Sequence, residues 1–438
     1  MSDTINPQFV PWIRQASPYI HAHRQKTFVL AMGGDAVSSD NLAGIVQDIA
    51  LLKSLGVNIV LVFGVRPQLD ALLKKQNLTS TYTLNNLRVT TAKMMEALWA
   101  ATGQVSQLLQ ASFSSGLPDS PLHGAQLQVV STNAITAKPL GVLDGIDYQH
   151  TGHVRKVNTS LIKNVLAADA ITLVPPLGYS LTGETFNLEY LELAGQVASA
   201  IGAQKLIIYS KHAGILDQKK QCLREIKTHQ VKTLKPNSNT QRKILDIAVR
   251  ACEQGVERTH VINYNEDGSL LKELLTRDGC GSLISANGYD ELRQATIDDI
   301  SGIMALILPL EEKGTLVRRE RELLETEISN FVVITRDAAV IGCAAVYLFD
   351  EDKSAELACI VSHEDYKGQR VGERLLAHIE TTAKNAGAKS LFVLTTQTAH
   401  WFAQQGFKPS TIDTLPEDKK SLYNYQRASK VLLKSLTT

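Results

Sequence analysis

A short basic and glycine-containing segment lies near the C-terminal end of the chain. It reads KGQRVG, residues 367–372, and leads into apolar residues at helical spacing, namely Val371, Leu375, Leu376, Ile379 and Ala383. The N-terminus of a helix is the positive end of its dipole and normally attracts acids, yet this helix would start with Lys367, Arg370 and Arg374. An anion held by free backbone N–H groups and these cations would resolve the conflict. A solvated basic helix start is the alternative that these residues leave open.

The elements around this segment predict a separate unit over residues 290–438. The segment follows a strand at 356–361, which alternates at first and then becomes continuously apolar. A turn at Asp337-Ala338-Ala339 predicts a hairpin of two further strands. The other predicted elements are a strand at 292–295, a helix at 297–308, a charged helix at 316–328, a strand at 391–395 and a helix at 400–405. The order is therefore β-α-α-β-β-β-α-β-α-β, and an Asn-Gly turn within residues 285–289 marks the boundary to the preceding region.

Residues 26–285 alternate between apolar strands and amphipathic helices. Predicted strands include 28–32, 57–63, 171–174, 205–209 and 259–263. This alternation indicates an α/β fold with a parallel sheet that is covered on both faces. An N-terminal arm, residues 1–25, carries a broken apolar stripe that could pack on its own domain or on a neighbouring subunit.

Charge and composition exclude several classes of function. The chain of 438 residues has a formal net charge of +1, so it has no general electrostatic footprint for nucleic acid or a membrane. No signal peptide is expected, and no apolar run is long enough to span a bilayer. The five cysteines are scattered, which predicts neither a disulfide framework nor a metal site. We therefore expect a cytoplasmic protein.

The strand, the basic turn and the helix together resemble the GCN5-related N-acetyltransferase fold, an α+β domain. Members hold the pyrophosphate of acetyl-CoA with an Arg/Gln-x-x-Gly-x-Gly/Ala turn; here Lys367 stands for its first residue and Arg370 replaces the first glycine of the pair. The stretch WFAQQGF, residues 401–407, also matches the family, which often closes with an aromatic pair, three residues and Gly-Phe. The resemblance implies acetyl-CoA as co-substrate and no permanently bound cofactor. The acetyl-CoA contacts that it implies are Ile360, Val361, Lys367, Gly368, Arg370, Gly372 and Glu373.

The first 285 residues resemble the amino-acid kinase fold, an open sheet with helices on both faces. The matching stretches are FVLAMGGDAV, VFGVRPQLD, LRVTTAKMMEAL, VPPLGYSLTGETFNLE and IIYSKHAGIL. Three features imply that the kinase chemistry has been lost: Ala31 stands at the catalytic lysine position, Leu191 stands at the position of an organising aspartate, and residues 63–66 break the glycine run. Phosphoryl transfer depends on positive charge at the γ-phosphoryl oxygens, and this resemblance implies that the charge is missing.

A kinase-like domain joined to an acetyltransferase domain resembles the bacterial N-acetylglutamate synthase family over essentially the whole chain. The match is close in LVRRERELLE, ELACIVSHEDY, LFVLTTQTAHWF and LPEDKKSLYNYQRASKVL. The resemblance implies acetyl transfer from acetyl-CoA to the α-amino group of L-glutamate, the first step of arginine biosynthesis. It also implies inhibition by L-arginine bound to the kinase-like domain, and a homo-hexamer built through those domains and the N-terminal arm.

An acceptor with two carboxylates and one amine needs two separate cations and a base. By resemblance the cations are Arg319 and Arg427, and Glu356 is the general base, directly or through water. On the residues alone, Arg319 could belong to a solvated helix face, and Glu356 could be an exposed carboxylate at the end of a strand.

The remaining candidates for the reaction are a thiol and a hydroxyl. Cys359 is expected to touch the substrate through its backbone or thiol, because the sequence shows no adjacent base that would make it a nucleophile. We therefore expect the acetyl group to pass directly from acetyl-CoA to the acceptor in a ternary complex. Thr395 could relay the proton or could be satisfied by backbone. Many related transferases use a tyrosine as the acid for the thiolate; Phe402 stands there, so that role is unassigned.

For the arginine site, the resemblance implies that Glu273 binds the guanidinium of the ligand. The other end of the arginine molecule would bind Gly279, Gly281 and Ser282 of the RDGCGS turn. Glu273 could equally be an ordinary exposed helix residue. For the whole chain, the alternatives are an active kinase fused to an unrelated module, a non-catalytic amino-acid sensor, and an acetyltransferase for another amine, either a small acidic one or a protein lysine.

Overall fold

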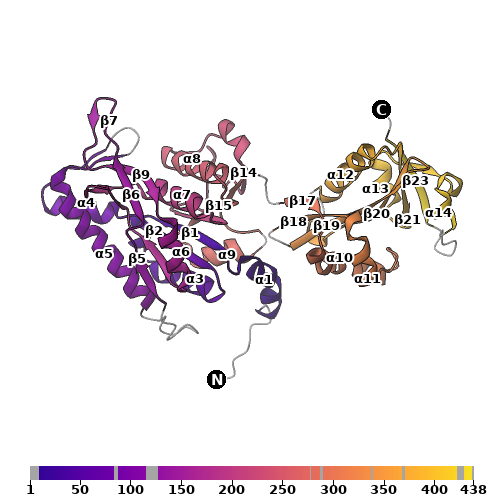
Figure 1. The fold of residues 1–438 in the computed structure, drawn as a ribbon, viewed down its shortest axis with the longest axis horizontal. Coiled ribbons are helices and arrows are strands. Elements are labelled where there is room, and N and C mark those ends of the chain that lie inside the picture. The colour runs from indigo at the N-terminus through magenta and orange to yellow at the C-terminus, as the bar shows by residue number, and fades with distance from the viewer. Residues whose placement is uncertain are drawn as a thin grey trace, which may run out of the picture. The chain divides into compact units, whose positions relative to one another are not determined.

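The computed structural model describes residues 9–82, 87–114, 127–276, 278–286, 290–336, 339–366, 370–421 and 429–436. The chain divides into two units, Met1–Gly288 and Tyr289–Thr438 (Figure 1). In the described part of the chain, no helix combines the length and apolar character needed to cross a membrane.

The first unit is built on an eight-stranded sheet with the order β14-β16-β15-β13-β1-β2-β10-β5. Neighbouring strands run parallel except β15 and β16, as the alternation of strands and helices predicted. The strands are β1 (Thr27–Met32), β2 (Asn58–Phe63), β5 (Val129–Ser131), β10 (Ile171–Val174), β13 (Lys205–Ser210), β14 (Glu225–Lys227), β15 (Arg258–Asn263) and β16 (Ser282–Ser285).

Helices cover both faces of this sheet, and β1 contributes to both cores. Phe28 and Leu30 pack into one apolar cluster with α3, α5 and α9, whereas Val29 and Ala31 pack into another with α7 and α8. A strand that is buried on both faces reads as a continuous apolar run, which is why β1 was predictable. The helices are α1 (Phe9–His23), α2 (Gly34–Val37), α3 (Leu42–Ser54), α4 (Arg66–Lys75), α5 (Met95–Ser114), α6 (Thr159–Ala167), α7 (Tyr190–Ile201), α8 (Asn239–Glu253) and α9 (Ser269–Leu275).

Smaller sheets complete the first unit. One has the order β12-β11-β6-β9, and two are two-stranded hairpins. Their strands are β3 (Thr81–Tyr82), β4 (Arg88–Val89), β6 (Ile135–Pro139), β7 (Val142–Leu143), β8 (Ile146–Asp147), β9 (Gly152–Val157), β11 (Leu177–Tyr179) and β12 (Thr185–Asn187).

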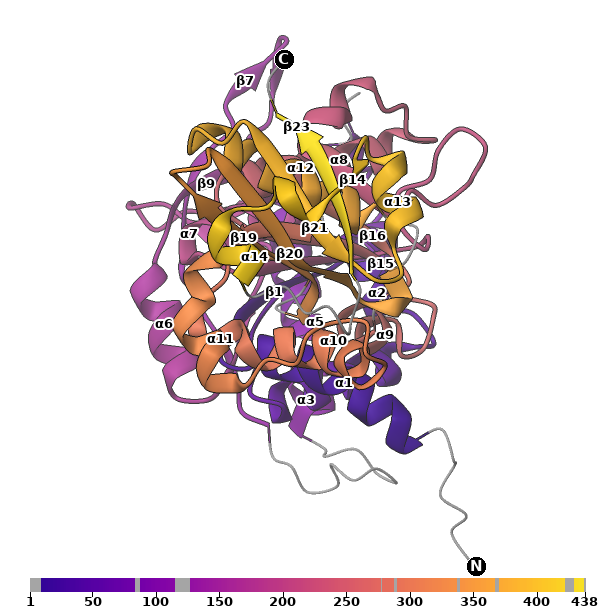
Figure 2. The ribbon, with the colours of Figure 1, turned by 90° about the vertical axis from the view of Figure 1, so that its right-hand side faces the viewer.

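The second unit has one seven-stranded sheet with the order β17-β18-β19-β20-β21-β23-β22. Figure 2 shows β19, β20, β21 and β23 side by side. Helices α12 and α13 pack on one face, and α10 and α11 on the other. The elements are β17 (Asp290–Gln294), α10 (Ile300–Glu312), α11 (Arg321–Glu327), β18 (Phe331–Arg336), β19 (Ala339–Phe349), β20 (Ser354–Ser362), α12 (Val371–Asn385), β21 (Ser390–Thr395), α13 (Ala399–Gln404), β22 (Lys408–Ser410), α14 (Glu417–Ser421) and β23 (Lys430–Ser435).

Three predicted boundaries in this unit were wrong. The charged helix expected at 316–328 begins only at Arg321, so Arg319 lies in an extended connection. Helix α10 continues through Pro309 to Glu312 instead of ending near residue 308. After α13 the predicted order has one strand, whereas the structure has two, β22 and β23, and β23 pairs with both β21 and β22. Charged residues at helical spacing do not require a helix, and a strand inserted between two others is specified by partners far away in the sequence.

Candidate active site

The second unit is organised around the point where β20 and β21 part. These strands run parallel and pair only over Ser354–Glu356 and Ser390–Phe392. Beyond Glu356, β20 remains paired with β19, and β21 remains paired with β23 along its opposite edge. Within the described chain, the side of Cys359–Val361 that faces β21 therefore has no strand partner. Unpaired backbone N–H and C=O groups at such a place are available to an extended ligand.

A bulge redirects the backbone of β20 beside this point. The register between β19 and β20 shifts between Cys343 and Ala345, and Cys359 has a φ of +52°. A left-handed conformation is uncommon for a residue other than glycine and costs on the order of 1 kcal/mol or more. Bulges of this kind are frequent beside active sites, where they re-aim a side chain. Nothing in the sequence signalled this conformation.

Glu356 is the last paired residue of β20 before the strands part. It is buried, so the alternative of an exposed strand-end carboxylate is wrong. Its Oε2 lies 2.7 Å from Lys419 Nζ of α14. Its neighbour across the β19–β20 pair is Tyr347, whose hydroxyl donates a hydrogen bond of 2.6 Å to Glu327 Oε2. The Glu356 carboxylate thus lies in a small polar cluster on one face of the sheet.

Arg319 reaches the same region from the extended connection before α11. Its backbone N–H donates to Glu311 Oε1 at 2.9 Å, and its Nη1 lies 3.8 Å from Cys359 Sγ. Burial opposes the charged guanidinium, but Cys359, Tyr347 and Glu327 raise the pKa of Arg319 overall. The structure therefore brings Arg319 and Cys359 together, and it places a permanent cation beside the parted strands.

Cys359 has an environment that the sequence did not reveal. A hydrogen bond with the Cys343 thiol and the charge of Arg319 lower the pKa of Cys359, although burial opposes its ionisation. The same contact and burial raise the pKa of Cys343. A guanidinium beside a thiol stabilises the thiolate, but it cannot accept the proton as a general base does.

Thr395 lies at the end of β21, and its hydroxyl is used locally. Its Oγ1 lies 2.8 Å from Thr398 Oγ1 and accepts the Thr398 N–H at 3.1 Å. These bonds close the turn into α13. The alternative of a locally satisfied strand-end hydroxyl therefore has direct support, whereas the proton relay stays a prediction.

The start of α12 has the features expected of an anion site. Arg370 is its N-cap with a φ of +59° and a ψ of +24°, and no side chain caps the helix. A Cβ at Gly372 would lie 3.1 Å from Trp401 Cζ2, so a larger residue would displace this ring. Glu373 lies in the first turn, whereas Arg374 forms an ion pair of 2.5 Å with Asp290. Free N–H groups at the start of a 15-residue helix favour a phosphate.

Three predicted site residues lie outside the described residues. They are Lys367, Gly368 and Arg427, and their roles stay predictions.

Replacing Arg370 by Gly separates the role of its side chain from that of its backbone. We expect the Kd for acetyl-CoA to rise roughly fivefold, because a charge that can contact phosphate is lost. The free energy of unfolding should stay unchanged or rise by up to about 1 kcal/mol, because glycine suits a left-handed residue. Calorimetric titration with CoA and thermal unfolding measure the two effects. Arg370→Asn, which also tolerates this conformation, should show the same loss; tighter binding by Arg370→Gly would instead identify the arginine as an obstruction.

The aromatic motif of α13 forms a packed cluster. Phe402 is almost fully buried and meets Trp401 and Phe407 in edge-to-face contacts with ring centroids 4.9 Å and 5.3 Å apart. Phe402 has no ionisable group, so the acid for the leaving thiolate stays unassigned. A thiol leaves more easily than an alcohol because its pKa is near 8.5, which reduces the need for a strong acid.

In the first unit, Glu273 is buried and fully engaged. Its Oε1 lies 2.7 Å from His260 Nδ1, and its Oε2 accepts the N–H groups of Cys280 and Gly281, each at 2.7 Å. The alternative of an exposed helix residue is therefore wrong. Burial alone would raise the pKa of Glu273, but the hydrogen bonds from His260, Gly281 and Cys280 outweigh it and lower the pKa.

A buried lysine extends this cluster. Lys205 Nζ lies 3.4 Å from His260 Nε2. Burial and Lys205 lower the pKa of His260 to about 4, so its neutral ring donates from Nδ1 to Glu273 and accepts at Nε2. Burial and Arg258 lower the pKa of Lys205 to about 7. The sequence did not single out His260 or Lys205, because each lies within an apolar strand.

Backbone N–H groups of the RDGCGS turn donate to Glu273, whereas the side-chain hydroxyl of the turn bonds to other parts of the fold. Gly279 has a φ of +58°, and a Cβ at Gly281 would collide with the Val261 carbonyl oxygen. The hydroxyl of Ser282 accepts the Ile215 N–H at 2.8 Å and donates to the Leu223 carbonyl. The structure thus brings Glu273 together with Gly279 and Gly281, whereas the Ser282 side chain is committed to the fold.

The glycine turns of the kinase-like region are filled by an aromatic side chain. A Cβ at Gly33 would lie 2.8 Å from the Tyr190 hydroxyl, and one at Gly64 would lie 2.9 Å from Tyr190 Cδ1. Ala31 is buried in β1 and Leu191 is buried in α7. Tyr190 therefore occupies space that these glycines would otherwise leave open, and the sequence gave no sign of this packing.

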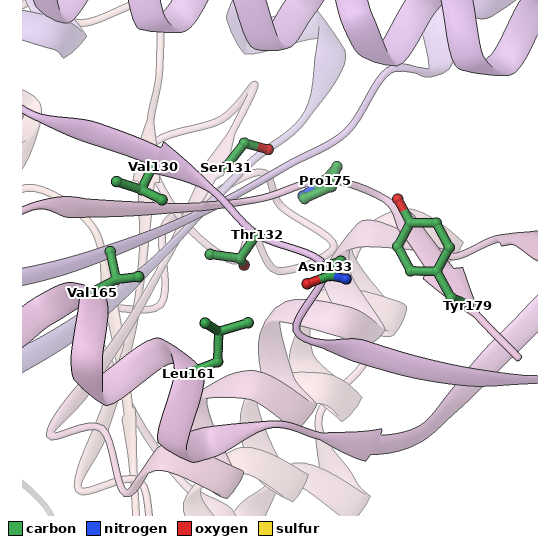
Figure 3. Close-up of a pocket in the computed structure, with 8 residues that line it drawn as sticks. All are labelled: Val130, Ser131, Thr132, Asn133, Leu161, Val165, Pro175 and Tyr179. Atoms are coloured by element: carbon green, nitrogen blue, oxygen red, sulfur yellow. The ribbon is translucent and has the colours of Figure 1, made fainter. Parts of the chain in front are cut away.

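A separate pocket of about 380 Å³ lies at the ends of β5 and β10 beside α6 (Figure 3). Thr132, Asn133 and Tyr179 give it polar groups, and Leu161 and Val165 form an apolar wall. None of its lining residues is charged. Across the described chain, no group of three or more His, Cys, Asp and Glu side chains could hold a metal ion.

Comparison with known proteins identifies both regions. Residues 26–263 match the amino acid kinase family, and residues 327–409 match the GNAT acetyltransferase domain. An amino-acid acetyltransferase of Pseudomonas fluorescens is 46% identical over 98% of this chain and 100% of its own length. One from Azotobacter vinelandii is 45% identical over 98% of this chain and 99% of its own.

Solved structures give the same result. The N-acetylglutamate synthase of Neisseria gonorrhoeae in complex with coenzyme A and L-arginine has a TM-score of 0.87 and 35% identity, over 98% of this chain and 100% of that one. The complex of that synthase with coenzyme A and N-acetyl-glutamate has a TM-score of 0.62 and 36% identity, with the same coverage. The predicted fold class and the predicted resemblance are confirmed. This chain is therefore an enzyme of the amino-acid acetyltransferase family, with an amino acid kinase domain followed by a GNAT domain.

Proposed function

We propose that this enzyme transfers the acetyl group of acetyl-CoA to the α-amino group of L-glutamate, giving N-acetyl-L-glutamate and CoA. The observation that carries this proposal is the convergence of Glu356 and Arg319 on the point where β20 and β21 part. A buried carboxylate there suits an amine that must lose a proton, and a guanidinium suits a carboxylate of the acceptor. The Neisseria synthase, solved once with coenzyme A and L-arginine and once with coenzyme A and N-acetyl-glutamate, supports this substrate class.

The reaction proceeds by direct transfer in a ternary complex. The pantetheine of acetyl-CoA pairs with the open backbone of Cys359–Val361, and its pyrophosphate binds the first turn of α12. Arg319 and Arg427 hold the two carboxylates of glutamate. Glu356 takes the proton of the amine, whose lone pair forms the new C–N bond while the C–S bond breaks. Backbone N–H groups of β20 stabilise the negative charge that develops on the thioester oxygen.

The test is thiol release from acetyl-CoA, measured with a panel of amino acids and other amines, with and without arginine. We expect the highest kcat/KM with glutamate. If another amine gives the highest kcat/KM, that amine and not glutamate is the acceptor. If no amine causes release of the thiol, the alternative of a non-catalytic sensor is favoured. ATP binding by the kinase-like region would support the alternative of an active kinase.

The kinase-like domain acts as a regulatory domain that has lost phosphoryl transfer. This proposal is supported by Ala31 and Leu191 in the apolar core and by Tyr190 against Gly33 and Gly64, since a side chain there competes with a phosphate for the glycine backbone. L-Arginine inhibits the enzyme by binding at Glu273 and the turn that contains Gly279, Gly281 and Ser282. A guanidinium that reaches Glu273 has to replace or share the contact with His260, so this cluster differs between the free and inhibited states.

Replacing Glu273 by Gln tests this arginine site. We expect arginine inhibition to weaken by about 10- to 100-fold, because hydrogen bonds to a charged group contribute about 1.5–3 kcal/mol. Turnover without arginine should change little. The measurement is an arginine titration of the acetyl-transfer rate. The matched control is Glu266→Gln. Glu266 lies just before α9 and forms an exposed ion pair with Lys272 of that helix. Equal inhibition of wild type and Glu273→Gln would remove Glu273 from the site.

The protein works in the cytoplasm as a homo-hexamer. The outer face of α1 supports self-association, because Val10, Trp12 and Ile13 are each more than 40% exposed while Ala16 and Tyr19 pack inward. Apolar exposure of this kind on a helix is typical of interaction surfaces. Light scattering of the full chain and of a chain that lacks residues 1–25 gives the oligomeric state.

A further inference from the structure

A lysine of the C-terminal tail lies against the proposed general base. Lys419 belongs to α14, between β22 and β23. Its Nζ lies 2.7 Å from Glu356 Oε2 and 5.5 Å from the ring centroid of Tyr347. Since Tyr347 is the neighbour of Glu356 across the β19–β20 pair, Lys419 contacts two adjacent side chains on one face of the sheet. The next residue, Lys420, instead forms an exposed ion pair with Glu417.

The burial of the two charges differs. The Glu356 side chain is 8% exposed, and the Lys419 side chain is 28% exposed. A buried carboxylate is unfavourable when ionised unless a positive charge offsets the lost hydration. Lys419 supplies this charge from a side chain that is itself only partly buried. The ammonium of Lys419 therefore offsets part of the hydration that the Glu356 carboxylate loses on burial.

The geometry of this contact matters for catalysis. Within the described residues, Glu356 Oε2 has the Lys419 ammonium nearby but no hydrogen bond of regular geometry. The contact is thus an ion pair that leaves lone-pair directions of the carboxylate open. The ring of Tyr347, held by its hydrogen bond to Glu327, lies within cation–π range of the ammonium. An ammonium in this position lies beside the negative charge of the Glu356 carboxylate but leaves room for the proton that comes from the acceptor amine.

We propose that Lys419 is a positioning residue that keeps Glu356 ionised and aimed at the acceptor amine. The inference rests on the proposed function, in which Glu356 is the general base. When Glu356 takes the proton, the ion pair loses its negative member, so the ammonium favours release of the proton to solvent and restores the base for the next turnover. Lys419 itself exchanges no proton and acts through Glu356.

The experiment compares the pH dependence of kcat for wild type, Lys419→Met, Lys419→Arg and Lys420→Met, each as the full chain. In Lys419→Met we expect the acid limb of the profile to move to higher pH by about one unit or more, because an opposite charge at this distance shifts a carboxyl by about that amount. At low pH this is a loss of about tenfold in kcat, while the high-pH plateau stays within a few-fold of wild type. Lys419→Arg should restore the limb, and Lys420→Met should leave it unmoved.

A purely structural ion pair gives a different result. It would lower the plateau at every pH without moving the limb, and that outcome overturns the proposal. If Lys419→Met fails to fold, Lys419→Gln keeps a polar donor without the charge and should show the shifted limb; an unshifted limb overturns the proposal as well. If wild type prefers another amine, the profiles are measured with that amine, so a wrong acceptor is told apart from a wrong role of Lys419.

Discussion

Glu356→Gln is expected to lower kcat for glutamate acetylation by about 10²- to 10⁴-fold, the contribution that a general base typically makes. The amide fills the same volume but cannot accept the proton of the amine. Binding of CoA should change little, because the predicted contacts of CoA are the backbone of Cys359–Val361 and the start of α12. Steady-state thiol release gives kcat, and calorimetric titration gives the affinity for CoA.

The matched control for this variant is Glu380→Gln. Glu380 forms an ion pair with Lys434 in the same unit, and its side chain is also largely buried, at 20% exposure. Loss of that pair affects stability but removes no group from the parted strands. If Glu356→Gln retained kcat within a few-fold of wild type, Glu356 would not be the base, and the positioning role of Lys419 would fail with it.

Arg319→Ala is expected to raise the KM for glutamate by about 30-fold or more, since truncating one partner of a hydrogen-bonded charge pair costs about 2–5 kcal/mol. The KM for acetyl-CoA should change far less. Arg319→Lys should recover only part of the loss, because an ammonium cannot form the two parallel hydrogen bonds of a guanidinium. Arg427→Ala is predicted to show the same selective effect. Initial rates with each substrate varied in turn separate the two KM values.

Arg321→Ala is the control for the effect of charge. Arg321 lies two residues further along, and its side chain is 65% exposed in an ion pair with Glu325. Its loss should leave both KM values unchanged. Unaltered glutamate kinetics in both Arg319→Ala and Arg427→Ala would show that other residues hold the carboxylates.

Several features of the second unit were predictable because they depend on neighbours in the sequence. The apolar residues of α12 repeat at helical spacing, so its start at Val371 follows from the pattern. The run from Glu356 to Val361 identifies β20 in the same way. The shared glycine and aromatic motifs then identified the family, which local periodicity alone does not.

The arrangement of the candidate site was decided by tertiary structure. The pairing of β20 with β21 stops at Glu356 and Phe392, while β21 stays paired along its other edge with β23, a strand from the tail, over Ser390–Thr395. The left-handed backbone of Cys359 results from a bulge opposite β19. Periodicity carries no information about either, because both arise from partners that are distant in the sequence.

The sequence by itself determined the residue types at the KGQRVG turn, the order of the elements up to α13, and the presence of Glu356 and Cys359 on one strand. Only the tertiary structure decided that Glu356 is buried against Lys419, that Arg319 reaches Cys359 from an extended connection, and that Glu273 is engaged by His260. The physical reason is that helix and strand patterns reflect burial along a local segment. An ion pair across 63 positions, as between Glu356 and Lys419 (419 − 356 = 63), depends instead on how the whole unit folds.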